Sequence, residues 1–314
     1  MTLSNLPSFV DIHEDVLNAI EQSAPIVALE STIITHGMPF PDNAEMAASV
    51  EALIRDYEVV PATIAVIDGR IKIGLTHNEL LQLANVKNAL KISRADMAFA
   101  ISQGKTAGTT VAATMIIARM AGIRIFATGG IGGVHKGAET NFDISADLTE
   151  LGKTDVLVVA AGAKAILDVP KTLEVLETQG VPVIGYQTNT LPAFWTRESN
   201  LDVPLRMNNT SQISDFLKVR DELHLNSGIL IANPIPKKDE IPSEIIKSYI
   251  ETAQEEMEKS NISGKDVTPF LLKRIFELSK GTSLKSNIAL VKNNALIAAK
   301  ICLLYTSPSP RDRG

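Results

Sequence analysis

The chain lacks most of the features that mark secreted, membrane-bound or nucleic-acid-binding proteins. It has one cysteine, Cys302, in 314 residues, which excludes an internal disulfide and any zinc or iron–sulfur site built from several cysteines. Its 30 Lys and Arg are outnumbered by 36 Asp and Glu, so it has no basic surplus to neutralise a nucleic-acid backbone. We therefore expect a protein of a reducing compartment that does not bind nucleic acid.

Long uncharged stretches and targeting signals are also missing. The longest stretch without charge, from Thr178 to Thr196, contains Pro182, Gly185 and Pro192, which is not typical of a membrane-spanning helix. The N-terminal sequence MTLSNLPSFVDIHED carries neither a basic segment followed by an apolar core nor an Arg-rich amphipathic pattern. These observations predict a soluble, cytoplasmic protein with no membrane partner.

Strand-like and helix-like segments alternate along most of the chain. Short apolar runs predict strands at Pro25–Glu30, Ala62–Ile67, Arg124–Thr128, Asp155–Ala160, Val181–Tyr186 and Gly228–Ala232. Helical spacing of apolar residues occurs at Asn43–Tyr57, Thr109–Ala121, Thr210–Leu223, Ser243–Glu258, Thr268–Lys280 and Leu284–Ile301. This alternation predicts a layered α/β/α fold with a central, mainly parallel sheet. The pair Asp68–Gly69 adds a small predicted hairpin.

We expect a single domain that ends shortly before the C-terminus. Apolar residues make up 45% and charged residues 21% of the chain, as in ordinary globular proteins, and no repeat or Pro-, Gly- or Ser-rich linker occurs before residue 303. The last residues, 302–314 (CLLYTSPSPRDRG), depart abruptly in composition from the Ala-rich helix before them. We therefore assign residues 1–301 to the domain and interpret 302–314 as a tail that is non-native or disordered.

Two glycine-containing segments are candidates for binding a phosphate group. Gly108-Thr109-Thr110 opens an apolar helix, where N–H groups and hydroxyls suit an anion, although ordinary helix capping explains the same residues. The four glycines at 129, 130, 132 and 133 follow a strand but fail the dinucleotide-binding pattern, because His135 stands where the third glycine is needed. A ligand-binding loop and a tight packing turn explain these glycines equally well.

Several charged residues stand where catalysis or metal binding is possible. Glu30 ends the run PIVALE and Lys164 follows DVLVVAAG, positions where partial burial favours the neutral forms needed for acid–base and nucleophilic work. Asp143 and Asp147 flank Ser145, and on a helical turn they would share a face that suits a weakly held magnesium or manganese ion. Helix capping, solvated surface and, for His36, a place in the core are the ordinary alternatives.

Nine longer motifs occur in order between about Val16 and about Lys300: VALESTIITHGMPFP, GTTVAATM, FATGGIGGVHKGAE, FDISADL, AGAKAILD, IGYQT, ANPIP, TPFLL and SLKSNIALVKNNA. Together they resemble the pseudouridine-5′-phosphate glycosidase family, also called pseudouridylate synthase. The resemblance implies an α/β fold that assembles as a homotrimer and uses manganese. It also implies reversible cleavage of the carbon–carbon bond that joins uracil to ribose 5-phosphate, as part of pseudouridine catabolism.

The same resemblance implies roles for individual residues. Lys164 in AGAK becomes the covalent nucleophile, Glu30 in ALEST the proton donor and Asp143 in FDISAD the manganese ligand. The implied substrate contacts are Lys91, Thr110, Val111, His135, Ser145, Ala146, Asp147 and Asn287. Among these contacts, Lys91 and the Thr110–Val111 pair hold the phosphate and sugar, and Asn287 lies on the uracil side.

Independent chemistry explains why such a reaction needs a lysine. Uracil that leaves through carbon is a poor carbanion, so the reaction needs an electron sink, which an imine between Lys164 and the ring-opened sugar provides. Two alternative functions use the same groups, namely a phosphosugar-binding module without catalysis and a Schiff-base aldolase. Intact Glu30, Asp143 and Lys164 argue against the first, and Asn287 argues against the second. Release of free uracil separates all three hypotheses.

Overall fold

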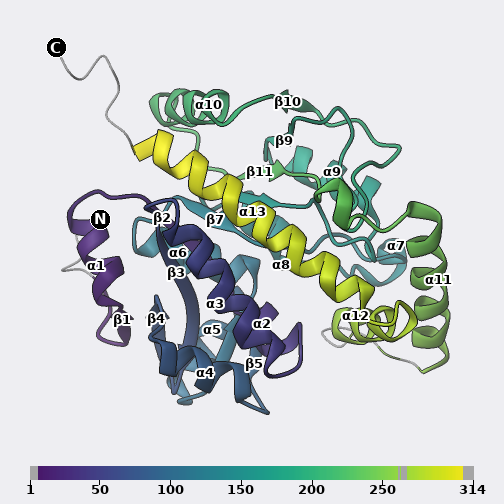
Figure 1. The fold of residues 1–314 in the computed structure, drawn as a ribbon, viewed down its shortest axis with the longest axis horizontal. Coiled ribbons are helices and arrows are strands. Elements are labelled where there is room, and N and C mark those ends of the chain that lie inside the picture. Colours follow the sequence, from purple (N-terminus) through teal and green to yellow (C-terminus); the bar gives the residue numbers. More distant parts are fainter. Residues whose placement is uncertain (1–5, 261, 263–266, 307–314) are drawn as a thin grey trace.

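The computed structural model describes residues 6–260, 262 and 267–306. These residues form a sheet of eleven strands with helices packed around it (Figure 1). The centre of the sheet is a run of parallel strands in the order β3 (Val60–Ile67), β2 (Ile26–Leu29), β7 (Ile125–Ala127), β8 (Leu157–Ala160), β11 (Ile229–Ala232), β9 (Val183–Tyr186) and β10 (Leu205–Met207). β2, β7, β8 and β11 are buried at every position, as expected for parallel strands covered on both faces. The predicted mainly parallel sheet is confirmed.

β3 belongs to two parts of the sheet because it is long enough to change neighbours along its length. Its first half pairs with β2, and its second half pairs antiparallel with β4 (Arg70–Ile73) and β6 (Ala107–Thr109). Asp68 and Gly69 join β3 to β4 with positive φ angles of 49° and 76°, which a type I′ turn requires. The predicted hairpin is therefore confirmed. β1 (Val10–Ile12) and β5 (Leu90–Ile92) extend this side through β4 and β6.

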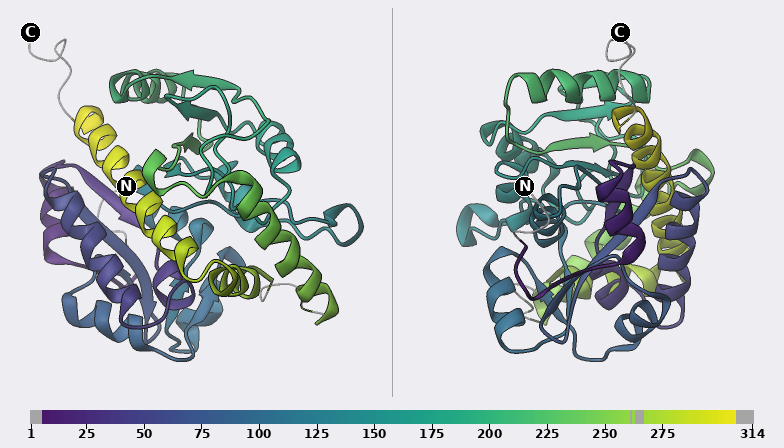
Figure 2. Two further views of the ribbon diagram at one scale, coloured as in Figure 1. Left: turned by 45° about the vertical axis from the view of Figure 1, so that its right-hand side comes forward. Right: turned by 90° about the vertical axis from the view of Figure 1, so that its left-hand side faces the viewer.

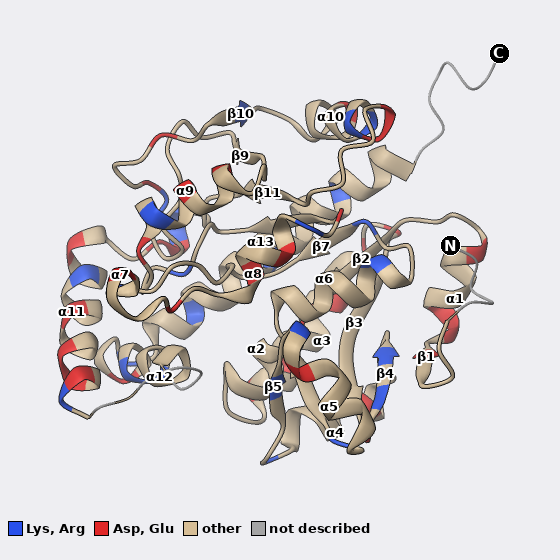
Figure 3. Cartoon of the chain, turned by 180° about the vertical axis from the view of Figure 1, so that it is seen from behind, with Lys and Arg blue, Asp and Glu red and all other residues tan. Residues whose placement is uncertain are grey.

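Helices cover both faces of the parallel strands, which gives the predicted three layers. α13 (Thr282–Thr306) crosses one face in contact with β2, β7 and β8, and α3 (Asp42–Arg55) and α10 (Thr210–Glu222) pack beside it (Figure 2). α6 (Val111–Met120) and α8 (Ala146–Leu151) lie together on the opposite face, which Figure 3 shows from behind. Many of the residues of the peripheral helix α11 (Ser243–Lys259) are charged.

The remaining elements connect these layers or lie at the rim of the sheet. They are α1 (Glu14–Glu21), α2 (Thr32–His36), α4 (His77–Asn85), the 3₁₀ turn η2 (Arg94–Asp96), α5 (Met97–Ser102), α7 (Ala138–Asn141), α9 (Val169–Thr178), η3 (Lys237–Asp239) and α12 (Val267–Leu278).

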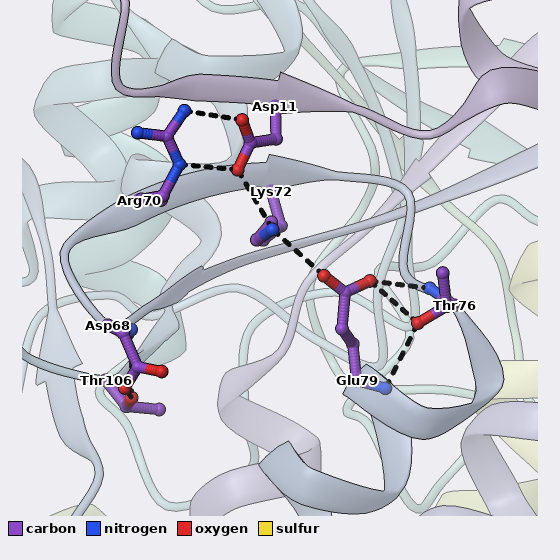
Figure 4. A network of polar contacts seen from close by, with 7 residues as sticks. All are labelled: Asp11, Asp68, Arg70, Lys72, Thr76, Glu79 and Thr106. Atoms are coloured by element: carbon purple, nitrogen blue, oxygen red, sulfur yellow. Dashed lines mark hydrogen bonds and ion pairs between the residues drawn. The ribbon is translucent and has the colours of Figure 1, made fainter.

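A polar network fastens the N-terminal strand β1 to the edge of the sheet (Figure 4). The Asp11 carboxylate in β1 accepts two hydrogen bonds from Arg70, with Nε at 2.7 Å and Nη2 at 2.6 Å. Lys72 Nζ lies 2.9 Å from Asp11 Oδ2 and 3.0 Å from Glu79 Oε1. Glu79 also exchanges hydrogen bonds with Thr76, the N-cap residue of α4. The hydrogen bonds from Arg70 hold the pKa of Asp11 well below its usual range. The network therefore joins β1, β4 and α4 as long as the carboxylates stay ionised.

The C-terminal helix differs from the sequence-based expectation. By length and composition alone α13 is apolar enough to cross a membrane, but half of its most apolar window is buried in the protein, as in the core helix of a folded domain. The helix continues five residues beyond the expected limit at residue 301, and Cys302 is 2% exposed. Tyr305 also donates a hydrogen bond of 2.7 Å to Asp221. Disorder was therefore wrongly predicted for residues 302–306, while 307–314 lie outside the described residues.

Candidate active site

The predicted site residues come together around two adjoining cavities at the carboxyl ends of the central strands. The larger one, the polar chamber, has a volume of about 350 Å³ and is lined by Glu30, Lys91, Thr110, Val111, His135, Asp143, Ser145, Ala146, Asp147 and Lys164. The smaller one, the apolar chamber, has a volume of about 70 Å³ and includes Asn287 beside Phe194, Leu272, Leu290 and Val291. Glu30, Lys91 and Lys164 line both chambers. The boundary between the chambers therefore carries the groups that were expected to do chemistry.

Sheet topology explains why Glu30 and Lys164 meet. Glu30 follows β2, Lys164 follows β8 after a short turn, and β7 lies between these two strands. The backbone N–H of Lys164 donates a hydrogen bond of 3.1 Å to Ile131 in the loop after β7, which holds the turn in place. Because parallel strands end at the same edge, polar residues after each strand converge there. This edge is where open α/β sheets bind ligands.

Glu30 has the character of an acid rather than a permanent anion. Burial raises its pKa above the usual 4.5, and this effect outweighs the opposing influence of Lys164 and of a hydrogen bond from Thr128. Thr128 follows β7 and is 2% exposed, so its hydroxyl is held against the Glu30 carboxyl group. A carboxyl group in this setting retains its proton at a higher pH than a solvated one. It is therefore suited to donate a proton inside the cavity.

The polar chamber is lined by residues of both charges, with Lys91 and Lys164 beside Glu30, Asp96, Asp143 and Asp147. Burial lowers the pKa of His135, and the charges of Lys91 and Lys164 lower it further against the opposing effect of Asp143, whose Oδ2 lies 4.0 Å from His135 Nδ1. His135 is therefore mainly neutral near pH 7, while the two lysines act on it from β5 and from the turn after β8. The two lysines are the residues of this chamber that can pair with an anionic ligand, whereas the carboxyl groups beside them suit a cation.

The start of helix α6 forms one wall of the polar chamber. Thr110 is its N-cap and accepts a hydrogen bond of 3.4 Å from the N–H of Ala113, while its hydroxyl lies 2.9 Å from Ser93 Oγ. Thr110 and Val111 line the chamber, as expected for a helix N-terminus that faces an anion. Thr109 does not, because it is fully buried and donates a hydrogen bond of 2.7 Å to the carbonyl of Ile64. The anion site therefore excludes the first threonine of the motif.

Asp147 joins the glycine loop to the start of α6. Its Oδ1 accepts a hydrogen bond of 2.9 Å from Ala112 N–H, and its Oδ2 accepts one of 2.8 Å from Gly132 N–H. A Cβ atom on Gly132 would lie 2.3 Å from Ser145 Oγ, so only glycine fits there. The glycine loop thus serves both as a close-packed turn and as a wall, because Gly132 also lines the polar chamber.

The expected helical face with two carboxylates is not formed. Helix α8 begins at Ala146 with Ser145 as its N-cap, so Asp143 lies before the helix and does not share a face with Asp147. Both oxygens of Asp147 accept backbone N–H groups, whereas the Asp143 side chain is 35% exposed and lines the polar chamber. The described residues contain no group of three or more His, Cys, Asp or Glu that could hold a metal. Asp143 is therefore the carboxylate that a cation in the polar chamber could use, with water supplying the remaining ligands.

Two functional partners escaped the sequence analysis. Thr128, which donates a hydrogen bond to Glu30, is the last residue of a predicted strand and was not predicted to belong to the site. Its polar side chain at a strand end is the feature that could have indicated this role. Trp195 donates a hydrogen bond of 2.6 Å from Nε1 to Asn287 Oδ1. No local pattern marks Trp195, because its partner lies 92 residues further along the chain.

Comparisons with known proteins show the family to which the chain belongs. The sequence model of the family described as "Indigoidine synthase A like protein" matches residues 15–303. A protein of Dinoroseobacter shibae named pseudouridine-5′-phosphate glycosidase is 72% identical over 305 residues, which is 97% of this chain and all of that protein. A protein of Mesorhizobium japonicum with the same name is 60% identical over 293 residues, 93% of this chain and 96% of that protein.

Two solved structures share the fold over almost the whole chain. The prealnumycin C-glycosynthase AlnA, solved in complex with ribulose 5-phosphate, has a TM-score of 0.88 and 34% identity and covers 96% of this chain and 98% of its own. An indigoidine synthase A-like protein of Thermotoga maritima has a TM-score of 0.88 and 31% identity, with coverages of 98% and 100%. The chain therefore belongs to the indigoidine synthase A-like family, together with relatives named pseudouridine-5′-phosphate glycosidase.

Proposed function

We propose that this protein reversibly cleaves the carbon–carbon glycosidic bond of pseudouridine 5′-phosphate, giving uracil and ribose 5-phosphate. The observation that carries the proposal is the position of Glu30 and Lys164, which line both the polar and the apolar chamber. In this proposal the phosphosugar lies on the polar side and the base on the apolar side, which puts the bond between them beside the acid and the amine. The names of the close relatives support the same reaction.

The polar chamber accounts for recognition of the phosphosugar. Lys91, Thr110 and Val111 hold the phosphate and sugar in this proposal, since an ammonium group and a helix N-terminus both attract a phosphate. His135 and the segment Ser145–Asp147 contact the sugar on the neighbouring walls. The phosphate is remote from the bond that breaks, so its binding energy serves mainly to position C1′ at Lys164.

The reaction begins with opening of the sugar ring. Glu30 donates a proton to the ring oxygen as the C1′–O4′ bond breaks, and the uracil ring supplies the electron pair that forms a double bond to C1′. The neutral amine of Lys164 then adds to C1′, and the displaced electron pair returns to the uracil ring. The product of this step is a covalent adduct in which C1′ carries both the lysine nitrogen and uracil.

The Glu30 carboxylate takes the proton that the lysine nitrogen loses after it adds to C1′, and then delivers this proton to uracil C5, which allows cleavage. The electron pair of the C1′–C5 bond returns to the ring as its C5=C6 double bond, and the lone pair of the lysine nitrogen forms a C1′=N imine. Uracil leaves as a neutral molecule, and water hydrolyses the imine to release ribose 5-phosphate and free Lys164. Formation of the imine thus allows uracil to leave as a neutral molecule, whereas cleavage without the lysine would release a carbanion.

Asp143 is the side chain that would hold manganese in this proposal, with water completing the coordination shell. A bound divalent ion would orient the substrate and stabilise negative charge in the polar chamber. We further propose that the protein acts as a cytoplasmic homotrimer in pseudouridine breakdown. The motif resemblance supports the trimer and the role in breakdown, and the low cysteine content supports the compartment.

Incubation of the pure protein with pseudouridine 5′-phosphate and manganese tests the proposal. Chromatography should show uracil and ribose 5-phosphate in equal amounts, and mixing the two products should re-form the nucleotide. A noncatalytic phosphosugar-binding module would bind the nucleotide without releasing uracil. An aldolase would instead cleave a bond within a free phosphosugar and leave the nucleotide intact.

A further inference from the structure

The orientation of the Asn287 side chain is fixed by a buried tryptophan. Trp195 is 1% exposed, and its Nε1 donates to Asn287 Oδ1 at 2.6 Å and to the backbone carbonyl of Ser283 at 3.3 Å. An indole N–H can only donate, so the carboxamide atom that faces it must be the oxygen. The two ends of the Asn287 amide are therefore distinguished by chemistry.

Trp195 cannot easily turn away from this partner. Its ring packs edge-on against Phe194 with centroids 5.0 Å apart, and its backbone carbonyl accepts a hydrogen bond of 3.0 Å from Ile241 N–H. Phe194, which has a positive φ of 63°, lines the apolar chamber and packs closely against Gly130. Phe194 thus contacts the glycine loop, while Trp195 is bonded to Ser283 and Asn287 of helix α13.

Because the oxygen is engaged, the polar atom that Asn287 has left to offer is Nδ2, which is a donor. The bond to Trp195 is the one side-chain hydrogen bond that Asn287 makes to the part of the chain that the structure describes. Asn287, Lys164 and Glu30 all belong to the lining of the apolar chamber. Nδ2 is the donor that Asn287 has left for a ring bound beside Lys164, because its oxygen already accepts from Trp195.

We propose that Trp195 is a positioning residue that sets the base specificity of the site. By engaging Oδ1, it makes Asn287 present an N–H group, which selects a ring carbonyl at that position and disfavours a ring amino group. Uracil carries carbonyls at both C2 and C4, whereas cytosine carries an amino group at C4 and isocytosine one at C2. The inference rests on the proposed function, in which the apolar chamber holds uracil.

The test compares Trp195→Phe with the unaltered protein in the synthetic direction, from uracil and ribose 5-phosphate. Phenylalanine keeps an aromatic ring but lacks the N–H, so the Asn287 carboxamide is free to turn over. Loss of one hydrogen bond corresponds to a rise of roughly 3- to 10-fold in the KM for uracil. The KM for ribose 5-phosphate should stay within about 2-fold, and inhibition by cytosine or isocytosine should strengthen relative to uracil binding.

Two further variants separate positioning from a structural effect. In an Asn287→Ala background, Trp195→Phe should change the uracil KM by less than about 2-fold, because the group that it orients is gone. Tyr305→Phe, which removes a hydrogen bond to Asp221 at a site that contributes to neither chamber, should leave both KM values unchanged. An equal rise of both KM values in Trp195→Phe, or an undiminished effect in the Asn287→Ala background, would overturn the proposal.

A spectroscopic measurement decides the orientation separately from turnover. Trp195 is the only tryptophan of the chain, so ¹⁵N-labelled protein gives one indole N–H signal. That signal should exchange slowly with water and should shift and exchange faster in Asn287→Ala. An indole N–H unaffected by Asn287→Ala would refute the positioning role. If the unaltered protein instead makes no nucleotide from uracil and ribose 5-phosphate, the proposed function fails and base selection by Trp195 fails with it, whatever the indole signal shows.

Discussion

Thr128 donates a hydrogen bond to Glu30 across the ends of two neighbouring strands, β7 and β2. This bond favours the ionised carboxyl group and lowers its pKa, whereas burial raises it more strongly. The acidity of Glu30 is therefore set by opposed contributions, of which burial is the largest. The hydrogen bond from Thr128 is one that a nearly isosteric substitution can remove.

Thr128→Val should raise the pKa of Glu30 further, because it deletes the hydrogen bond and keeps the burial. If protonated Glu30 is the active form, the alkaline limb of the pH profile of kcat/KM should move to higher pH. A pH titration of both proteins measures the shift. Movement of the limb to lower pH, or no movement at all, would contradict the acid role of Glu30.

Glu30→Gln should lower kcat by roughly 10²- to 10⁴-fold, since an amide cannot donate the proton. The same variant should alter stability in a pH-dependent way. The folded protein holds the Glu30 proton above the usual pKa of 4.5, so the unaltered protein loses stability as the pH rises from there to the folded pKa. In thermal melts, the Tm of Glu30→Gln relative to the unaltered protein should be higher at pH 8 than at pH 4. An equal change at both pH values would mean that Glu30 is not perturbed by folding.

Lys91→Ala tests the phosphate side of the polar chamber. Loss of a charge-assisted contact should reduce kcat/KM for pseudouridine 5′-phosphate by roughly 10- to 100-fold. The unphosphorylated nucleoside should be a far poorer substrate of the unaltered protein. The substitution should bring the kcat/KM values for nucleotide and nucleoside closer together. Parallel losses on nucleoside and nucleotide would place the phosphate elsewhere.

Removal of divalent metal should abolish activity, and manganese should restore it. Asp143→Ala should block the restoration, because it removes the carboxylate proposed to hold the metal, while both oxygens of Asp147 already accept backbone N–H groups. Asp143→Asn, which keeps the shape without the charge, is the matched control and should need much more manganese. Full turnover by the unaltered protein in excess chelator would show that the reaction needs no divalent metal.

The last turns of α13 should matter for stability and not for chemistry. A chain that ends at Ile301 loses the buried Cys302 and the bond from Tyr305 to Asp221, so its Tm should fall by roughly 4–8 °C. A chain that ends at Thr306 keeps both and should melt like the full chain. Because burial raises the pKa of Cys302 to about 12, its thiol should also resist alkylation until the protein unfolds. Equal melting temperatures for the two truncated chains would show that the end of the helix is dispensable.

The sequence predicted the elements that carry a repeating apolar pattern. The six predicted strands and the hairpin at Asp68–Gly69 all form, because each combines apolar residues with a clear turn or helix boundary. β1, β5, β6 and β10 escaped prediction, since each has three residues and, unlike β7, includes a charged residue or glycine. Helix α13 ends five residues beyond the predicted limit at Ile301, because apolar residues continue to Tyr305 across the change in composition.

The site was predictable where polar residues follow strands and much less so where partners are distant in sequence. Glu30 and Lys164 stood at strand ends, so the topology of a parallel sheet already placed them at one edge. The two aspartates of FDISAD were wrongly placed on one helical face, because Ser145 caps α8 after Asp143. The bond from Trp195 to Asn287 forms between a loop and α13, which only tertiary packing brings together.

Covalent trapping at Lys164 tests the central claim most directly. Borohydride added to the protein with ribose 5-phosphate should reduce the imine to a stable amine, and mass spectrometry should find the added sugar phosphate on the peptide that contains Lys164. Lys164→Ala should stay folded and should give neither the adduct nor uracil release. An adduct on another lysine, or normal turnover by Lys164→Ala, would contradict the mechanism proposed for this site.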